Sequence, residues 1–470
     1  MNTNTSSSVV GTRIIPIEAF VSHCHIHLDE VAATWLVATL GYKFFPGAEK
    51  APIRFVAGNP RGGDADYDSD KVLPLGCGGG RFDEHTPNGR KPDECSATLV
   101  AKYLGVEGRP GIKEILVEVL RCDQDVGTHG LQMAELIKAA HRCLPGGDRS
   151  VVKWAMMGLG WACRQIKMSY SPQNGTEPGA VSMFEKWLLR DKPDDKVKSF
   201  IRRLCEESEQ RQDVTGVDFI IRAMHRGGKT IDEIGEWTLS AFRWIQTDQE
   251  QFHKAVSEIK TGKPDKQTRV AVGDASEAHF FRTNTPDGGG RFVQVLVVRT
   301  GDMSDKFLAR RAHRAAMWLK PAVLIMRHPD GHTQVFCHQK AGLHPDVSAD
   351  IAAQLRYYEG GREAGLTWDA LQKSGDTECS PVWYYFKKAQ AVMNGSESHP
   401  GVKPTELGLQ TVIDVVRRAL WYPALQGWQR EMGVEFLPKD DKPQPLATAG
   451  EIAETHDREN GNGDKETKGA

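Results

Sequence analysis

Several features that would assign the chain quickly to a class are missing. No apolar run approaches the roughly 18 residues that a membrane-spanning helix needs, so we expect no membrane association. Residues 1–14 contain neither a basic segment nor an apolar stretch, so we expect no secretory signal. The nine cysteines are scattered over 470 residues and do not resemble a disulfide framework. The sequence therefore predicts a reduced, cytoplasmic protein.

An excess of one charge sign is also missing. The chain has 60 basic and 62 acidic residues, so its overall charge predicts no strong attraction to nucleic acid or to a membrane. Any site for a polyanion has to be a local patch. Hydrophobic residues make up 39% of the sequence and charged residues 26%, as in globular proteins with a core. The length predicts two or three domains.

Residues 1–130 alternate between strand-like and helix-like segments. Alternation of this kind predicts an α/β fold, with a parallel or mixed sheet covered by helices. The expected strands are 16–23, 51–58 and 71–76, and the expected helices are 29–41, 94–105 and 111–121.

The remaining chain separates into three parts. Residues 131–262 are helical throughout and are expected to complete or link the first domain. Residues 263–437 return to strands and helices, which predicts a second, smaller α/β domain. Residues 438–470 are polar and contain few large apolar side chains, so we expect a disordered tail.

The first candidate site is the stretch SHCHIHLDEVAATWLV, residues 22–37, which contains His23, His25, His27 and Asp29. In a strand, these alternate residues would share one face, whereas in a loop they could converge on a point. Imidazole and carboxylate groups together form a ligand set for zinc, manganese or iron. The segment lies between a strand and a helix, where α/β sheets bind ligands. The alternative is a polar loop whose histidines bond to the backbone.

Two further segments carry similar chemistry. Four glycines within residues 76–80 allow close backbone approach to a ligand, and Asp83, Glu84 and His85 follow directly. The alternative there is a glycine-rich turn with a solvated acidic exit. Asp123 and Asp125 end an apolar helix further on. Loops after successive strands would bring all three segments to one sheet edge.

Taken together, these segments resemble the DHH phosphoesterase superfamily, and more closely the melanocyte-proliferating-gene exonuclease family. SHCHIHLDEVAA is similar to that family's opening motif, T-H-x-G-x-F-H-C-D-E, with one residue fewer, and GCGGGRFDEH is similar to its D-V-G-G and D-H-H stretches. The resemblance implies catalytic roles for Asp29, Asp83 and His85. The metal ligands that it implies are His23, His27, Asp29, Glu84, and Asp123 or Asp125.

The chain departs from the family pattern at two positions. Aligned on Asp83, the family's second-motif aspartate falls on Gly76, and the first histidine of the triplet is Glu84. Glu84 remains a hard oxygen donor, whereas Gly76 offers no side chain. The open alternatives for the missing ligand are Asp64, Asp66, Asp68 and Asp70. The resemblance implies a divalent metal, manganese first, with magnesium or zinc also compatible, and one ion is the safer expectation.

Residues 299–313, 321–338 and 383–396 are similar to the superfamily's substrate-binding domain. A helix is expected over 305–320, with basic side chains recurring every four residues on one face. A solvated surface helix is the alternative for that face. The cluster Trp383–Tyr385 fits either base stacking or the core. The implied substrate-binding residues are His85, Arg310, Arg314, His332, Asn394, Gly395 and Ser396.

The function predicted on these grounds is metal-dependent hydrolysis of a phosphodiester in a nucleic acid or nucleotide, with an exonuclease as the leading expectation. One alternative is a non-catalytic protein that binds or senses a nucleotide on a degenerate scaffold. Another is a structural zinc site, because cysteine with histidine is a zinc ligand set. Its candidates, which lack C-x-x-C spacing, are Cys24, Cys77, Cys95 and Cys122.

Overall fold

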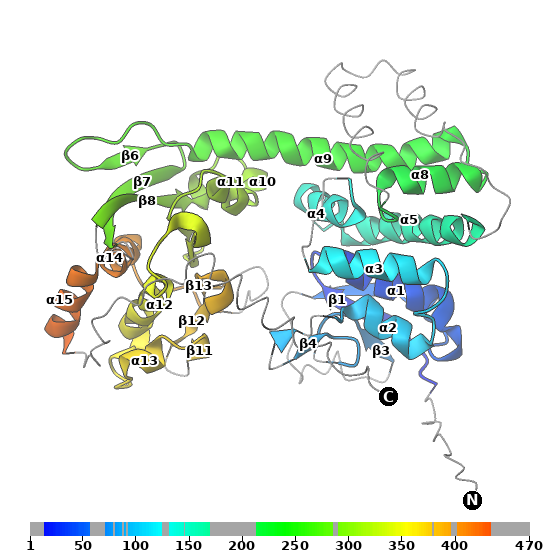
Figure 1. Ribbon diagram of the computed structural model, residues 1–470, viewed down its shortest axis with the longest axis horizontal. Coiled ribbons are helices and arrows are strands. Elements are labelled where there is room, and N and C mark those ends of the chain that lie inside the picture. Colours follow the sequence, from blue (N-terminus) through cyan, green and yellow to red (C-terminus); the bar gives the residue numbers. More distant parts are fainter. Residues whose placement is uncertain are drawn as a thin grey trace, which may run out of the picture. The chain divides into compact units, whose positions relative to one another are not determined.

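The computed structural model describes most of the chain. The described chain divides into two compact units, and the boundary lies between His253 and Lys254, inside helix α9 (Ile231–Ile259) (Figure 1). The boundary predicted at 262/263 lies a few residues beyond this point. The predicted tail, 438–470, lies outside the described residues. These are 14–56, 71–78, 80–86, 89–90, 93–124, 131–144, 146–169, 213–284, 290–377, 380–395 and 402–433.

The first unit is built on a three-stranded parallel sheet. β1 (Ala19–His23) lies in the centre, between β2 (Ile53–Val56) and β3 (Val72–Pro74). Every residue of β1 except His23 is buried, as expected for a parallel strand covered on both faces. Helix α1 (Leu28–Leu40) follows β1 and is buried from Leu28 to Val37, because it lies inside the core. The predicted α/β fold with a parallel sheet is confirmed.

The other elements of the first unit are mostly helices (Figure 1). They are η1 (Gly41–Lys43), β4 (His85–Thr86), β5 (Gly89–Arg90), α2 (Ser96–Leu104), α3 (Ile112–Asp123), α4 (Met133–Cys143), α5 (Asp148–Ser169), α8 (Val217–Arg226) and the first part of α9. One hydrophobic core includes residues from Ile15 to Ile245, so the helical middle completes this unit rather than forming a domain of its own.

Two tryptophans join the long helices of the first unit. The rings of Trp154 in α5 and Trp237 in α9 stack at 4.6 Å with 9° between their planes. Each indole Nε1 donates a hydrogen bond to the other residue's carbonyl oxygen, at 2.9 and 3.0 Å. The pair therefore buries two large rings and satisfies both indole donors.

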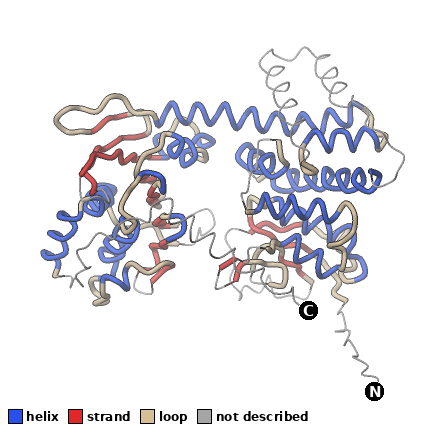
Figure 2. The backbone as a smooth tube through the Cα atoms, viewed as in Figure 1, coloured by secondary structure: helices blue, strands red, loops and turns tan. Residues whose placement is uncertain are grey.

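The second unit contains a mixed eight-stranded sheet, shown in red in Figure 2. β8 and β9 pair in parallel and the other neighbours pair antiparallel. The sheet is thus the larger of the two, although a smaller domain was expected here. Its strands, in spatial order, are β11 (Gly375–Thr377), β12 (Ser380–Phe386), β13 (Ala391–Asn394), β10 (Thr333–Cys337), β9 (Val323–Arg327), β8 (Gly290–Arg299), β7 (Ser276–Asn284) and β6 (Val270–Val272).

Helices and tight turns complete the second unit. Among the described residues of the whole chain, no helix is both long and apolar enough to cross a membrane. The helices are α10 (Lys306–Ala309), α11 (Ala312–Trp318), α12 (Val347–Arg356), α13 (Trp368–Leu371), α14 (Leu409–Leu420) and α15 (Tyr422–Met432), and the turns are η2 (Thr300–Asp302), η3 (Gln339–Ala341), η4 (Tyr357–Gly361) and η5 (Lys387–Ala389).

The single helix predicted over 305–320 is wrong, because the chain forms α10 and α11 instead. The two helices are separated at Arg310 and Arg311. Arg311 is fully buried, and its Nη1 donates to the carbonyl of Phe307 at 2.7 Å. Arginine in a helical pattern normally indicates the solvent-exposed face, so the sequence does not predict a helix break at a buried arginine. Arg310 and Arg314 are both exposed, but Arg310 lies in the turn between the helices and Arg314 in α11.

Arg356 at the end of α12 holds the second unit together from inside. Its side chain is fully buried and donates to the carbonyl oxygens of Leu371, Lys373 and Trp383, at distances of 2.7 to 3.2 Å. It also donates to Gly375. These carbonyls lie at the ends of α13 and in β11 and β12, so one guanidinium ties a helix end to a sheet edge.

We expect Arg356→Met to lower the free energy of unfolding by about 3 kcal/mol or more, because it leaves several buried carbonyls without donors. Urea denaturation measures the change. Arg310→Met removes an exposed arginine of the same unit and should change the free energy by less than about 0.5 kcal/mol. Equal effects of the two substitutions would contradict the structural role of Arg356.

Candidate metal centre

The histidine segment is a loop and not a strand. β1 ends at His23, and α1 begins at Leu28. Between them, His25 adopts a left-handed backbone conformation with φ of 61°, which turns the chain and ends the alternation of the strand. The rings of His23 and His27 lie 5.2 Å apart, whereas the ring of His25 lies near His141 instead. Of the two interpretations left open by the spacing, the loop is correct, but only His23 and His27 of the three histidines converge.

Glu30 joins the two converging histidines. Its Oε1 lies 2.8 Å from Nε2 of His23, and its Oε2 accepts a hydrogen bond from the backbone N–H of His27 at 2.6 Å. One potential ligand atom from each of His23, His27 and Glu30 lies within 4.8 Å of the others. Glu30 is absent from the ligand set predicted from the sequence. Its position three residues after the residue that precedes α1 is the pattern of a helix cap, which was the available signal.

The protonation states of this group follow from the ion pair. Burial alone lowers the pKa of His23, but the charge of Glu30 and the hydrogen bond to it outweigh burial and raise that pKa above its usual value. Burial raises the pKa of Glu30, but His23 outweighs it, so that pKa falls well below its usual value. The pKa of His27 is lowered, chiefly by burial, so its imidazole is neutral at pH 7.

The imidazole of His23 has a second nitrogen that suits a ligand role. Its Nδ1 is buried and has no hydrogen-bond partner among the described residues. Histidines that bind metals commonly donate one ring N–H to a carboxylate and bind the ion through the other nitrogen. His23, with one nitrogen paired to Glu30, has this arrangement.

A second group of potential ligands lies beside the first. Asp29, Cys95 and Asp123 each offer a ligand atom within 4.8 Å of the others. Asp29 lies in the first turn of α1 and is buried, and Asp123 is the last residue of α3. A carboxylate at the C-terminal end of a helix faces the negative end of the helix dipole, which a nearby cation would offset.

One cavity of about 400 Å³ contains most of both groups. It lies at the carboxyl end of β1, the position where parallel sheets bind ligands. Glu84 is buried in the wall of the cavity, and the hydroxyl of Ser96 lies 3.4 Å from Oε2 of Glu84. Lys138 of α4 also lines the cavity. The amphipathic pattern of that helix does not distinguish Lys138 from its other polar residues, so the sequence did not identify it. The lining residues are His23, His27, Leu28, Asp29, Glu30, Glu84, Cys122, Asp123, Ala134 and Lys138.

The loop that carries the histidines is held by the helical middle of the unit. His141 of α4 is buried, and its Nε2 lies 3.0 Å from the carbonyl oxygen of Ile26. Its Nδ1 lies 3.0 Å from Oδ1 of Asp148, and the same oxygen accepts the backbone N–H of His25 at 3.2 Å. His141 and Asp148 therefore fix the backbone between His23 and His27.

The remaining predicted site residues of this unit either lie away from the cavity or have side chains that the structure does not describe. Asp83 is half-buried and does not line the cavity, so the structure does not bring it to the cluster. The backbone of His85 lies in β4, and its side chain is not described. Asp125 and the four aspartates between residues 64 and 70 lie outside the described residues.

Gly76, at the position of the missing aspartate, supports the Glu30 side chain. Its φ is 66°, and a Cβ placed there would lie 2.6 Å from Cγ and 2.7 Å from Oε1 of Glu30. No side chain fits at position 76 while Glu30 holds its place. In this structure, Glu30 therefore occupies the space in which a residue-76 side chain would stand.

The four cysteines considered for a structural zinc site do not gather in one group among the described residues. Cys24 is exposed, whereas Cys77, Cys95 and Cys122 are buried. Burial raises the pKa of each of these three thiols to about 12, as expected for small buried side chains. Cys95 is the only one of the four in a group of potential ligands.

His332 in the second unit is occupied by structural contacts. Its Nδ1 pairs with Asp330 at 2.9 Å, and its Nε2 lies 2.8 Å from the carbonyl oxygen of Val402. Gly395 has a φ of 71°, and a Cβ there would lie 2.3 Å from the His332 ring. These residues fix a loop, and the substrate-binding roles predicted for His332 and Gly395 do not fit this arrangement.

Asn394 is likewise structural. It is fully buried, and its Nδ2 donates to the carbonyl oxygens of Val382 and Lys403, both at 2.9 Å. Its Oδ1 accepts the backbone N–H of Thr405 at 2.8 Å. Because both amide hydrogens are used, the predicted substrate contact is replaced by a role in holding the chain between β12 and α14. Ser396 lies outside the described residues.

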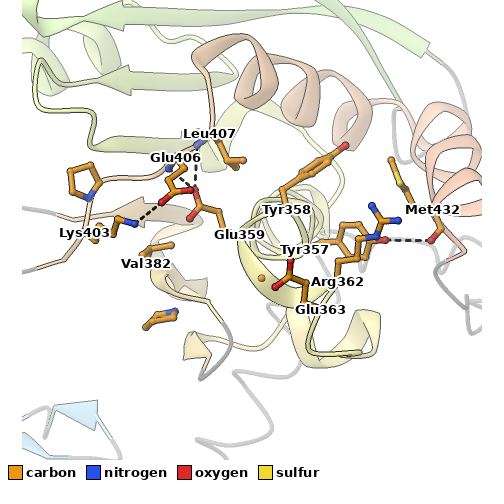
Figure 3. A pocket seen from close by; sticks show the side chains of 13 residues that line it. Tyr357, Tyr358, Glu359, Arg362, Glu363, Val382, Lys403, Glu406, Leu407 and Met432 are labelled. Carbon is orange, nitrogen blue, oxygen red and sulfur yellow. Dashed lines mark hydrogen bonds and ion pairs between the residues drawn. The ribbon is translucent and has the colours of Figure 1, made fainter.

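A larger cavity, of about 620 Å³, lies beside the π-helical turn η4 in the second unit (Figure 3). Its carboxylate Glu359 points toward the neighbouring loop and accepts the backbone N–H groups of Glu406 at 2.9 Å and Leu407 at 3.3 Å (Figure 3). Lys403 pairs with Glu406 at 2.5 Å. The acidic groups are thus used to hold the loop, and the cavity contains none of the predicted site residues.

We expect Gly76→Ala to weaken divalent-metal binding at least about tenfold, because the new Cβ displaces Glu30, which is tied to His23. Isothermal titration with Mn²⁺ measures the affinity. Gly105→Ala is the matched control, because Gly105 also has positive φ, at 65°, but a Cβ there meets no atom within 4 Å. If both variants bound Mn²⁺ equally well, Gly76 would have no part in positioning the cluster.

We also compared the whole chain with known proteins. No family model, curated protein or solved structure matches it. The geometry of the cavity is therefore the basis on which its function is inferred.

Proposed function

We propose that the chain is a metal-dependent phosphoesterase that hydrolyses a phosphodiester of a nucleic acid or nucleotide. The observation that carries this proposal is the cavity at the carboxyl end of β1. It gathers two histidines and four carboxylates from segments far apart in the sequence, namely the β1–α1 loop, the loop before α2 and the end of α3.

The charges in this cavity call for a cation. Asp29, Glu30 and Glu84 are 2 to 3% exposed, and Asp123 shares the same cavity. Burying a carboxylate is costly unless a positive charge or hydrogen bonds compensate it. Four carboxylates line the cavity, and the lining residues that can carry positive charge are Lys138 and the histidines, which are neutral when they bind an ion. A divalent ion would add positive charge among these carboxylates.

The donor set fits a divalent metal. Carboxylate oxygens with imidazole nitrogens suit manganese well, and magnesium or zinc are compatible. His23, through Nδ1, and His27 would hold an ion, with Glu30 orienting the His23 ring, and Asp29 and Asp123 would supply carboxylate ligands beside them. Two groups in one cavity fit one ion or two. When bound, such ions polarise phosphoryl oxygens and lower the pKa of bound water.

The protein groups around the ligands also suit a phosphate ester. Lys138 lines the cavity, and its ammonium group, which pairs with Glu135 at 3.1 Å, could turn to donate to a phosphoryl oxygen. A substrate contact by His85, which follows Glu84 directly, stays part of the proposal because the resemblance implies it, whereas Asp83, which does not line the cavity, is left out of the catalytic group.

The resemblance to the DHH phosphoesterases agrees with this proposal. Of the ligands that it implies, five line the cavity, namely His23, His27, Asp29, Glu84 and Asp123. The aspartate missing at Gly76 was the main departure. Since Glu30 fills that space with another carboxylate, the cavity keeps an acidic group there.

We expect the wild-type chain to shorten end-labelled single-stranded RNA or DNA, or to cleave a small phosphodiester, with Mn²⁺ present and not with a chelator. Asp29→Asn and Asp123→Asn should each reduce the rate by about 100-fold or more, because each removes a carboxylate ligand from the cluster. Glu49→Gln removes an exposed carboxylate of the same unit and should leave the rate unchanged.

Two outcomes would contradict the proposal. If no phosphodiester is cleaved although Mn²⁺ binds, the chain is a nucleotide-binding or sensing protein rather than an enzyme. If cleavage persists in chelator, or if Asp29→Asn is as active as Glu49→Gln, the cavity is not the active site.

A further inference from the structure

Three adjacent strands of the second unit present six side chains on one face of the sheet. In the register of β10, β13 and β12, Phe336 pairs with Ala391 and Ala391 with Phe386. In the next row, Gln334 pairs with Met393 and Met393 with Tyr384. Residues that are directly paired point to the same side of a sheet. We call this surface the aromatic face, and it consists of Gln334, Phe336, Tyr384, Phe386, Ala391 and Met393.

The two sides of these strands differ in burial. Val335, Tyr385 and Val392 point to the opposite side and belong to the hydrophobic core of the unit. On the aromatic face, Tyr384 is 43% exposed and Phe386 is 42% exposed. Two large rings at positions i and i+2 of one strand lie about 6.7 Å apart along it. Exposed apolar side chains that are contiguous, rather than scattered singly, mark interaction sites.

Basic residues lie at the end of the sheet nearest Phe386. β12 runs directly into η5, which carries the exposed Lys387 and Lys388, and β10 is followed by η3, which carries the exposed Lys340. Gln339 Nε2 donates to the carbonyl oxygen of Lys388 at 2.9 Å, so these two turns are in contact. Three lysines from two turns therefore lie beside one edge of the aromatic face.

Helix α11 also contacts the aromatic face. The ring of His313 in α11 packs against Phe336, with 4.3 Å between the ring centroids. Arg314, the next residue, is exposed. The basic residues of this surface thus come from α11 as well as from η3 and η5.

We propose that the aromatic face binds single-stranded nucleic acid, with bases stacked on Tyr384 and Phe386 and phosphates contacted by Lys387 and Lys388. Exposed rings combined with basic side chains are the means by which proteins hold single strands without sequence preference. A duplex does not suit this surface, because its bases are already stacked on one another. The rings and Met393 alone would also suit a protein interface, but the adjoining lysines favour a polyanion, because lysine is depleted in protein–protein interfaces.

This inference rests on the proposed function for its biological role, and it deepens that function by naming the substrate class. Binding to the face needs neither the cavity nor a metal. Affinity can therefore be measured in chelator, where no hydrolysis occurs, and the two proposals can fail separately.

The test is fluorescence anisotropy of labelled mixed-sequence RNA and DNA single strands, about 12 nucleotides long, with the full chain in EDTA. Tyr384→Ala and Phe386→Ala should each weaken binding by about tenfold, as expected for loss of one stacked base. Tyr384→Phe and Phe386→Tyr keep a ring and should bind like wild type. Tyr42→Ala removes an aromatic ring that is 65% exposed in the first unit and should have no effect.

The lysines are tested by salt dependence. The double variant Lys387→Ala, Lys388→Ala should reduce the slope of log K against log salt by about 1.4, since each single-strand phosphate contact contributes about 0.7. An unlabelled duplex of the same sequence should compete poorly.

Several results would overturn the inference. They are wild-type binding too weak to detect, equal binding by Tyr384→Ala and Tyr42→Ala, and equal competition by the duplex. Self-association that is lost in Tyr384→Ala, without strand binding, would show that a second copy covers the face. Asp29→Asn should bind strands like wild type, so loss of hydrolysis with intact binding would concern the cavity alone.

Discussion

The ion pair between His23 and Glu30 is the contact on which the candidate metal centre depends. It joins the last residue of the central strand to the first turn of the helix that follows, across 2.8 Å. Glu30 also accepts the backbone N–H of His27, so one carboxylate orders two histidines and the helix start. Because Glu30 is buried, its charge would be unfavourable without His23. The ion pair and the loop between His23 and Glu30 therefore stabilise each other.

The surrounding protein is shaped to keep this pair in place. Gly76 leaves room for Glu30, and His141 with Asp148 holds the backbone of the loop from the helical middle. This explains why the middle helices share one core with the sheet, since a separate helical domain could not reach the loop. Lys138, on the same helix as His141, places a positive charge in the cavity. The helical middle thus contributes both support and chemistry.

Much of the first unit was predictable, because its signals are local. Alternation of apolar strands and helices indicates a parallel sheet, and ligand-type residues at the end of β1 indicate a site at its carboxyl edge. The positive φ of His25 is not visible in a pattern, so the sequence left both a strand and a loop open. Glu30 could have been included from its capping position in α1, whereas Lys138 joins the site through tertiary folding, which residue spacing does not encode.

The second unit was harder to predict, because its polar residues are used in unexpected ways. Arg311 and Arg356 are buried, although arginine normally indicates surface, and Arg311 divides the helix predicted there. Asn394 and His332 look like ligands for an anion in sequence, yet they bond to backbone groups in the chain after β13. Their partners could not be identified from one sequence, because the contacts depend on how distant segments pack.

The central claim is that the cavity binds divalent metal through His23, Glu30 and their neighbours. Its most direct test is a titration of the chelator-treated chain with Mn²⁺, with free Mn²⁺ followed by electron paramagnetic resonance at room temperature. We expect saturable loss of the free-ion signal at one or two ions per chain, and strongly weakened binding in Glu30→Gln. A free-ion signal that grows in proportion to added Mn²⁺ from the first addition, or equal binding by wild type and Glu30→Gln, would contradict the account.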